Sequence, residues 1–158
     1  MAKNEASAGQ PTGALDQSEL KRYPGYFLAR ARYIAFKTFD QHIGRAYELR
    51  PVDFSVLLLL GSNGEVTQSQ LSVALGVAPS NMTGLLRRLQ ERGLIQRTRA
   101  ETDKRMQFIA LTPAGETLIE GAHSIGRAMD KGWLGRLTRA EQAMLLELLD
   151  KVSMAPRV

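Results

Sequence analysis

The hydrophobic positions of this chain recur at helical spacing over most of its length. Between residues 18 and 47 they lie three or four positions apart, which predicts a long first helix. A shorter and more uniformly apolar helix is expected from Pro51 to Leu60, where the segment 61–64 with its two glycines ends it. The helical spacing returns at Pro113–Lys131 and at Thr138–Val152, the latter opened by a capping box. These segments predict a mainly α-helical protein.

Two shorter helices are predicted in the middle of the chain, joined by a tight turn. The capping box Thr67–Gln70 opens the first, which covers Gln68–Leu75 and ends at Gly76. Its inward residues are expected to be Leu71, Ala74 and Leu75. A proline at the first helical position begins the second, Pro79–Arg92. Its expected buried stripe consists of Met82, Leu85, Leu86 and Leu89. Because its other side is polar and basic, the pair is predicted to form a helix-turn-helix.

A short hairpin is predicted directly after this pair. A basic strand that includes Arg97 leads into the charged tip Glu101–Arg105, and the apolar segment Met106–Leu111 returns along it. Taken alone, the two helices fit a bundle with a solvated basic side equally well. A helix-turn-helix followed by a basic two-stranded hairpin, however, is a winged helix. In that fold the hairpin tip can reach a groove or the backbone of DNA beside the second helix, the recognition helix.

The composition excludes several kinds of chemistry. The 158 residues include no cysteine and two histidines, His42 and His123. Disulfides and cysteine nucleophiles are therefore excluded. The common nucleotide-binding, hydrolase and zinc-protease motifs do not occur, so an enzyme has little support and no cofactor is expected. The net charge is +5, and residues 79–105, with seven basic and three acidic side chains, supply +4 of it. This placement of charge favours binding to nucleic acid.

The recognition helix and the hairpin carry side chains suited to duplex DNA. Short hydrogen-bonding groups at the start of the helix can meet base edges in the major groove, and arginines can bind guanine or phosphate. Arg105 is expected to enter the minor groove, with Asp103 pairing with it, capping the turn, or simply forming the turn. The predicted DNA-binding residues are Gln68, Ser69, Ser80, Asn81, Thr83, Arg87, Arg88, Arg99, Asp103, Lys104 and Arg105.

A resemblance to the MarR family of bacterial transcription regulators is carried by the segment GVAPSNMTGLLRRLQERGLIQRTRAETDKRMQFIALTPAGETL. Its most specific parts are the RLxxxGLIxR block at Arg88–Arg97, the Asp103-Lys104-Arg105 wing and the LTPxG exit at Leu111–Gly115; the resemblance extends from about Leu49 to Val152. It implies a homodimer with intertwined first and last helices, two winged domains on a palindromic double-stranded operator, and a pocket where small molecules, often aromatic acids, release the DNA. The dimerisation residues assigned on this basis are Leu145, Leu148, Leu149 and Val152.

Three positions depart from the family pattern. Ala78 stands where many relatives have a capping Asp or Ser, which weakens that helix start by about 1 kcal/mol. Gly84 replaces a commonly polar or basic residue that faces the groove, and Arg87 replaces a commonly acidic one. The base preference of a relative therefore does not transfer to this chain. The absence of cysteine also sets it apart from the thiol-based peroxide sensors of the family.

Aromatic residues are concentrated in the first helix. Seven of the ten lie between Tyr23 and Tyr47, interleaved with arginine and lysine. An aromatic stripe on a dimerisation helix is usually core, but seven rings cannot share one stripe, so some are expected to line a cavity or a surface. Aromatic walls with an arginine suit a flat aromatic acid or its coenzyme A thioester. The predicted pocket residues are Tyr26, Phe27, Arg30, Tyr33, Phe36 and His42.

The expected organisation has four parts. A disordered tail (1–17) precedes an N-terminal dimerisation helix (18–48), the winged helix-turn-helix (49–112) and C-terminal dimerisation helices (113–158). The sequence contains neither a signal-peptide core nor an apolar run close to the roughly 20 residues of a membrane span. A cytoplasmic location is therefore expected. The expected function is a ligand-responsive repressor, with activation left open. The alternative is a winged-helix protein-interaction module without specific DNA binding.

Overall fold

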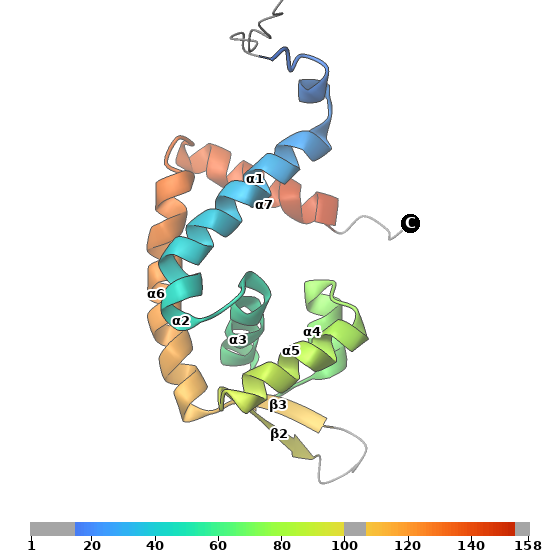
Figure 1. Ribbon diagram of the computed structural model, residues 1–158, viewed down its shortest axis with the longest axis vertical. Helices are drawn as coiled ribbons and strands as arrows, with labels where there is room; N and C mark the ends of the chain where they lie inside the picture. The colour runs from blue at the N-terminus through green and yellow to red at the C-terminus, as the bar shows by residue number, and fades with distance from the viewer. Residues whose placement is uncertain (1–14, 100–106, 154–158) are drawn as a thin grey trace, which may run out of the picture. The chain divides into compact units, whose positions relative to one another are not determined.

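The structure, a computed structural model, describes residues 15–99 and 107–153 (Figure 1). The chain forms two compact units whose boundary in the sequence lies between Tyr33 and Ile34. Most of the predicted tail, residues 1–14, and the predicted hairpin tip, Glu101–Arg105, lie outside the described residues.

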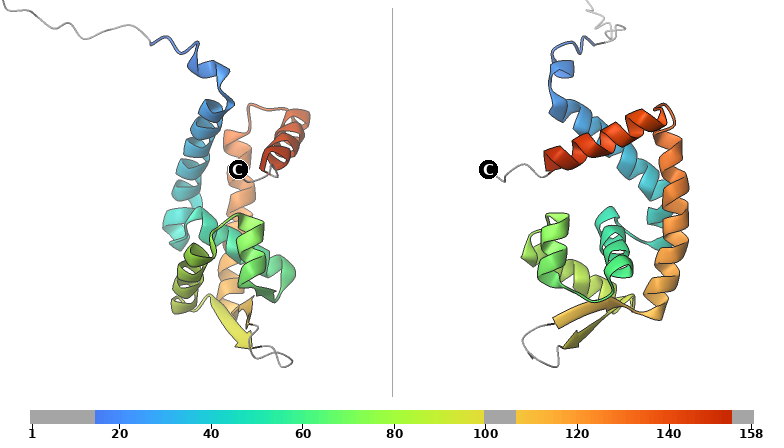
Figure 2. Two further views of the ribbon diagram at one scale, coloured as in Figure 1. Left: turned by 90° about the vertical axis from the view of Figure 1, so that its right-hand side faces the viewer. Right: turned by 180° about the vertical axis from the view of Figure 1, so that it is seen from behind.

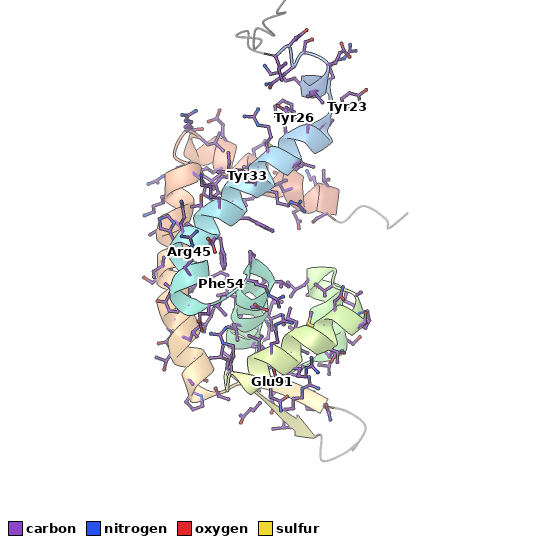
Figure 3. The ribbon with its side chains drawn as sticks, in the orientation of Figure 1. Tyr23, Tyr26, Tyr33, Arg45, Phe54 and Glu91 are labelled. Carbon is purple, nitrogen blue, oxygen red and sulfur yellow. The ribbon has the colours of Figure 1, made fainter. Side chains whose placement is uncertain are left out.

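The first unit contains the start of the predicted long helix. A short 3-10 turn, η1 (Leu20–Arg22), precedes α1 (Pro24–Phe39), which continues into the second unit. Within this unit the Tyr26 hydroxyl donates to Gln17 Oε1 at 2.9 Å and accepts from Arg30 Nη1 at 3.3 Å. The ring of Phe27 packs edge-on against the Tyr26 ring, with 5.4 Å between centroids. Figure 3 labels Tyr26 and Tyr33 on α1 and Tyr23 just before the helix begins.

The long helix is not regular to its end. After α1 it widens into a π-helical turn, η2 (Asp40–Gly44), and closes with α2 (Arg45–Tyr47). Across the turn Arg45 Nε donates to Asp40 Oδ2 at 2.8 Å. A Cβ at Gly44 would lie 3.1 Å from Asp40 Oδ1 and 3.3 Å from the Leu49 carbonyl oxygen, so glycine suits this crowded position. Turns of this type are frequent at functional sites.

The core of the second unit surrounds α3 (Pro51–Asn63). This helix packs against α6 (Pro113–Trp133), against α4 (Gln68–Leu75) and against the sheet, and the views in Figures 1 and 2 place it between α6 and α4. Its helical conformation continues past the predicted end at Leu60 to Asn63. The helix ends at Gly64, which has a positive φ of 69° and whose N–H donates to the Leu60 carbonyl oxygen at 2.9 Å.

The predicted wing is present, and a third strand accompanies it. β2 (Ile95–Arg99) and β3 (Gln107–Leu111) pair antiparallel, and β1 (Val66–Thr67) pairs with the other edge of β3. The central position, Ile109, faces Val66 on one side and Arg97 on the other and is buried. The sequence did not predict β1 because two residues are too few to show an alternating pattern.

The LTPxG exit of the wing locks α6 against the end of α5. Thr112 N–H donates to the Leu94 carbonyl oxygen at 3.1 Å, and Thr112 Oγ1 donates to the Gly93 carbonyl oxygen at 2.6 Å. A Cβ at Gly115 would lie 2.1 Å from the Leu94 carbonyl oxygen, so only glycine allows this approach. The two most specific blocks of the sequence therefore contact each other.

The last helix, α7 (Arg139–Ser153), begins at the predicted capping box. The N–H of Thr138 donates to Glu141 Oε2 at 2.7 Å and its hydroxyl donates to the same oxygen at 2.9 Å, while the Glu141 N–H donates to Thr138 Oγ1 at 3.3 Å. The pKa of Glu141 lies below its usual value because the carboxylate accepts these two hydrogen bonds. The bond from the Thr138 N–H has the larger effect and the bond from the Thr138 hydroxyl the smaller one. No residue of α7 is buried in the chain.

Candidate nucleic-acid interface

The predicted helix-turn-helix consists of α4 and α5 (Pro79–Glu91). The α4 capping box is formed as expected: Thr67 N–H donates to Gln70 Oε1 at 2.8 Å, and Gln70 N–H donates back to Thr67 Oγ1 at 3.3 Å. Left-handed glycines follow both helices, Gly76 with φ 61° and Gly93 with φ 69°. Gly76 lies in the short turn that joins α4 to α5, whereas Gly93 ends α5 before β2 begins.

One inward position of α4 was predicted wrongly. Ala74 is exposed, whereas Ser72 is buried beside Leu71, and Leu75 is half-buried. The buried side of this short helix extends from Leu71 and Leu75 toward Ser72. Ala74 lies beyond its opposite edge and is therefore exposed.

The apolar stripe of α5 is confirmed. Its four members are no more than 3% exposed: Met82, Leu85, Leu86 and Leu89. The opposite side holds Ser80, Gly84, Arg87 and Glu91 at spacings of three and four, which we call the outer face of α5. A Cβ at Gly84 would have nothing within 4 Å among the residues that the structure describes, so none of these neighbours requires glycine at this position. Figure 3 shows Glu91 near the end of this helix.

Two predicted DNA-binding residues are bonded to each other. Gln68 Nε2 of α4 donates to Thr83 Oγ1 at 2.8 Å and to the Pro79 carbonyl oxygen at 3.2 Å. Thr83 Oγ1 in turn donates to the Pro79 carbonyl oxygen at 3.0 Å. This tie holds the start of α5 against the start of α4, and it leaves Ser80 and Asn81 exposed beside it with Ser69.

The two adjacent arginines of α5 have different surroundings. Arg87 Nε lies 3.8 Å from Glu91 Oε1, and both side chains are largely exposed, so this pair is weak and its guanidinium is accessible to phosphate. Arg88 is half-buried: its Nη1 donates to the Gly84 carbonyl oxygen at 3.2 Å, and its Nη2 lies 3.4 Å from Oδ1 of the buried Asp53. Sequence reasoning grouped Arg88 with the DNA-binding residues and did not single out Asp53.

The start of α5 lacks a side-chain cap, as the sequence predicted. Ala78 is the N-cap residue and no side chain there accepts from the first turn. A shallow cavity of about 370 Å³ lies beside this helix start, lined by Gln68, Ser69, Ser72, Val73, Val77, Ala78 and Pro79. The helix start therefore presents backbone donors of the kind that bind phosphate.

The described part of the wing contributes basic strand residues. Arg97 is half-buried and its Nη1 donates to Gln107 Oε1 across the pair at 3.5 Å. Thr98 Oγ1 donates to Glu65 Oε1 at 3.3 Å, which ties β2 to the segment before β1. Arg99 ends β2 opposite Gln107. The predicted tip residues Asp103, Lys104 and Arg105 lie outside the described residues.

The six predicted pocket residues fall in both units. Tyr26, Phe27, Arg30 and Tyr33 belong to the first unit, and Phe36 and His42 belong to the second. In the second unit an open cavity of about 510 Å³ lies between α6 and the segment formed by the end of α1 and η2. It is lined by Thr38, Gln41, His42, Ile125, Ala128, Met129, Gly132 and Trp133. Of the six predicted pocket residues His42 lines this cavity, together with Met129 and Trp133, which lie about 90 residues further along the chain and were not among the predicted residues.

His42 has a defined orientation in this cavity. Its Nδ1 lies 2.9 Å from the Thr38 carbonyl oxygen, and because a carbonyl oxygen only accepts, Nδ1 carries the proton. In the neutral ring Nε2 is then an acceptor. Such an atom can receive a phenolic hydroxyl, and the protonated ring can receive a carboxylate.

The predicted dimerisation residues lie on one side of α7. Leu148 is 50% exposed, Leu149 39% and Val152 63%, and Leu145 is half-buried. Met144 is also exposed on this side. Within the described ranges no group of histidine and carboxylate side chains could hold a metal ion, and no helix has the length and hydropathy needed to cross a membrane.

The described geometry matches a known family. A family model described as the MarR family matches residues 47–106. The transcriptional regulator HosA of Escherichia coli is 30% identical over 118 residues, which cover 72% of this chain and 87% of HosA. The chain belongs to the MarR family. Its relatives are transcriptional regulators, and this is the class of protein that the winged helix-turn-helix here represents.

Two solved structures are similar over nearly the whole chain. The transcriptional repressor CouR bound to a 23-mer DNA duplex has a TM-score of 0.84 and 30% identity, and the match covers 89% of this chain and 99% of CouR. CouR from Rhodococcus jostii RHA1 bound to p-coumaroyl-CoA has a TM-score of 0.78 and 26% identity, and the match covers 88% of this chain and 97% of CouR. The mainly helical winged fold predicted from the sequence is thus confirmed.

Proposed function

We propose that this MarR-family regulator is a homodimeric repressor that binds a palindromic operator and leaves it when a small aromatic acid or its coenzyme A thioester binds. The observation that carries the DNA-binding part is the outer face of α5: it is polar, it holds the exposed Arg87, and its opposite side is fully buried in the chain's own core. A helix fixed in this way presents one constant surface to the major groove.

The recognition residues divide by role. Ser80, Asn81 and Arg87 are exposed and are the side chains that we expect to meet base edges or phosphates. Gln68 and Thr83 support the start of α5 through their mutual hydrogen bond and can share it with the DNA backbone. The wing residues Arg99, Lys104 and Arg105 complete the basic surface by their place in the sequence.

The homodimer is supported by the open apolar side of α7. Leucine, methionine and valine side chains that stay exposed along one helix side gain free energy when a partner covers them. A second copy of the same helix is such a partner, and twofold symmetry of the protein matches a palindromic operator. The alternative, a winged-helix module that only binds proteins, gives no account of the basic charge that surrounds the recognition helix.

The effector class is supported by the cavity between η2 and α6. Trp133 and Met129 supply flat and polarisable walls, and His42 supplies a polar group that can receive a hydroxyl or a carboxylate. A phenolic or benzoic acid has both features, a flat ring and a single polar end. The relative CouR, crystallised with p-coumaroyl-CoA, supports extending the class to thioesters.

A mobility shift with the DNA next to the protein's own gene tests this function. It is run at two salt concentrations, with and without a panel of aromatic acids and their coenzyme A thioesters. We expect a specific shift that weakens steeply with salt, because several phosphates are neutralised, and that one compound abolishes. A shift that no compound abolishes contradicts the effector part, and no specific shift at either salt favours the protein-interaction module.

A single-residue test addresses the wing. We expect Arg105→Ala to weaken operator binding by about 1–3 kcal/mol while the dimer stays intact, because a groove-inserted guanidinium is lost. The checks are the same mobility shift and size-exclusion chromatography with light scattering. Unchanged operator affinity shows that Arg105 does not contact the DNA.

A further inference from the structure

The junction between α2 and α3 is a sharp turn of three residues. Glu48 adopts the left-handed conformation (φ 52°, ψ 43°), which is uncommon for a residue other than glycine, asparagine or aspartate. Leu49 is buried, and the extended Arg50 leads into α3. A strained turn of this kind persists only where the surrounding structure holds it.

The recognition helix holds this turn from one side through Arg92. The Arg92 guanidinium donates from Nη1 to the Glu48 carbonyl oxygen at 2.7 Å and from Nη2 to the Tyr47 carbonyl oxygen at 2.8 Å. These carbonyls are at the end of α2, where helical acceptors lack partners and where the helix dipole favours a positive charge. Arg92 thus caps a helix that lies more than 40 residues earlier in the sequence.

Arg88 holds the other side of the junction through a shared carboxylate. Asp53, 5% exposed in the first turn of α3, accepts from Arg50 Nε and Nη2, both at 3.0 Å, and from the Arg50 N–H at 3.1 Å. Arg88 Nη2 approaches the same carboxylate at 3.4 Å. Arg88 therefore connects the recognition helix to α3, and Arg92 connects it to the end of α2, on the other side of the turn.

We infer that Arg92, with Arg88, is a positioning residue for operator recognition: it fixes α5 to the α2–α3 junction rather than contacting DNA. Arg88 and Arg92 are four positions apart and so lie on one side of α5, away from Arg87 on the outer face. The inference rests on the proposed function, because in a dimer the junction links each recognition helix to the dimerisation helices. These hydrogen bonds of Arg92 and Arg88, which we call the clasp, then set the distance between the two recognition helices.

The distance between recognition helices determines which spacing of operator half-sites is bound well. A helix held by two charged hydrogen bonds tolerates a wrong spacing poorly, because the bonds must break before the helix can shift. Loosening the clasp is therefore expected to lower affinity for the correct operator and to reduce the discrimination against a wrong one. Loss of a phosphate contact has a different effect, since it weakens both operators alike.

The experiment compares Arg92→Met, which keeps an unbranched side chain, with Arg92→Lys, which keeps the charge but cannot reproduce the two-pronged geometry. Each is measured by fluorescence anisotropy on the operator and on duplexes with one base pair added or removed between half-sites. We expect about a tenfold loss on the operator for both, a smaller penalty for altered spacing, and an unchanged dependence of log affinity on log salt. Thermal unfolding checks whether the variants are folded.

Arg87→Met is the matched control, because Arg87 is exposed on the same helix. Its salt slope should fall by about one while its spacing preference stays that of the wild type. A salt slope lowered by about one in Arg92→Met shows that Arg92 binds phosphate and overturns the inference, as does unchanged affinity with unchanged spacing preference. If Arg92→Met does not fold, Arg92→Lys decides by affinity and spacing preference: lysine would keep a phosphate contact but lose the two-pronged hydrogen bonds, so wild-type affinity and spacing preference overturn the inference. A wild-type protein without specific binding overturns the proposed function as well, so the two failures are distinguishable.

Discussion

The helices α5 and α7 have similar lengths and are both amphipathic, α5 more strongly, but they bury their apolar sides differently. In α5 the stripe that includes Leu86 and Leu89 is almost completely removed from solvent by the chain's own core. In α7 the corresponding side, with Leu148 and Val152, remains open. The same pattern in the sequence therefore has two outcomes, and the difference indicates which surface each helix offers to a partner.

The offered surfaces are opposite in character. The helix α5 offers its polar outer face, because its apolar side is buried in the core. The helix α7 offers its apolar side, because no described residue of the chain buries it. A polar helix face suits the hydrophilic edges and phosphates of DNA, and an apolar face suits another copy of the protein. Each prediction below changes one side of one of these helices.

The largest effect is expected in the stripe of α5. Leu86→Ala should lower the free energy of unfolding by about 2–5 kcal/mol, because the side chain is fully buried and its removal leaves a cavity in the core. Chemical denaturation measures the change, and Val73→Ala on the exposed side of α4 serves as a control with little expected effect. Equal stability of wild type and Leu86→Ala contradicts the assignment of this helix to the core.

A charge on the apolar side of α7 should prevent formation of the proposed dimer while the chain still folds. We expect Leu148→Asp to be a folded monomer whose operator affinity falls by about 100-fold or more, because each winged domain then binds alone. Light scattering gives the mass and anisotropy gives the affinity, with Asp150→Ala on the other side of the helix as the control. A monomer with full affinity argues against dimeric binding, and an intact dimer argues against Leu148 at the interface.

Sequence patterns predicted the fold well because most of it depends on neighbouring residues. The capping boxes at Thr67 and Thr138, the glycine after α4 and the stripe of α5 are all local features, and each is formed in the structure. β1 was missed since its strand character comes only from pairing with β3, more than 40 residues away. Helix periodicity likewise gave no sign that η2 would widen into a π turn.

The site was less predictable because its side chains interact across the chain. Arg88 reads as a basic residue of a recognition helix, and its neighbour Asp53 is 35 positions earlier, so no sequence pattern connects them. Gln68 and Thr83 were both predicted to bind DNA, but their mutual hydrogen bond depends on the angle between α4 and α5. Charge and residue type therefore predict a DNA-binding surface, and the tertiary contacts determine which of its side chains remain exposed.

A smaller effect is expected for Gly84→Ala, which should raise the stability of the fold and lower the affinity for the operator. Alanine should stabilise the fold by about 1 kcal/mol, because glycine is a poor helix former and the added Cβ has open space within the chain. Operator affinity should fall if DNA approaches the outer face as closely as proposed, since a methyl group then lies between helix and bases. A higher melting temperature with undiminished affinity shows that the DNA keeps further away from α5.

The smallest effect concerns the start of α7 and depends on pH. The Thr138 N–H, and then its hydroxyl, lower the pKa of Glu141, so the folded helix favours the ionised carboxylate. A lowered folded pKa means that this stabilisation is present above the usual pKa of glutamate and is lost as pH falls through the folded value. Glu141→Gln keeps a capping side chain without a titrating group. The melting temperature of the wild type, relative to that of Glu141→Gln, should therefore decrease on acidification, and a constant difference between pH 7 and pH 3 contradicts the role of the carboxylate.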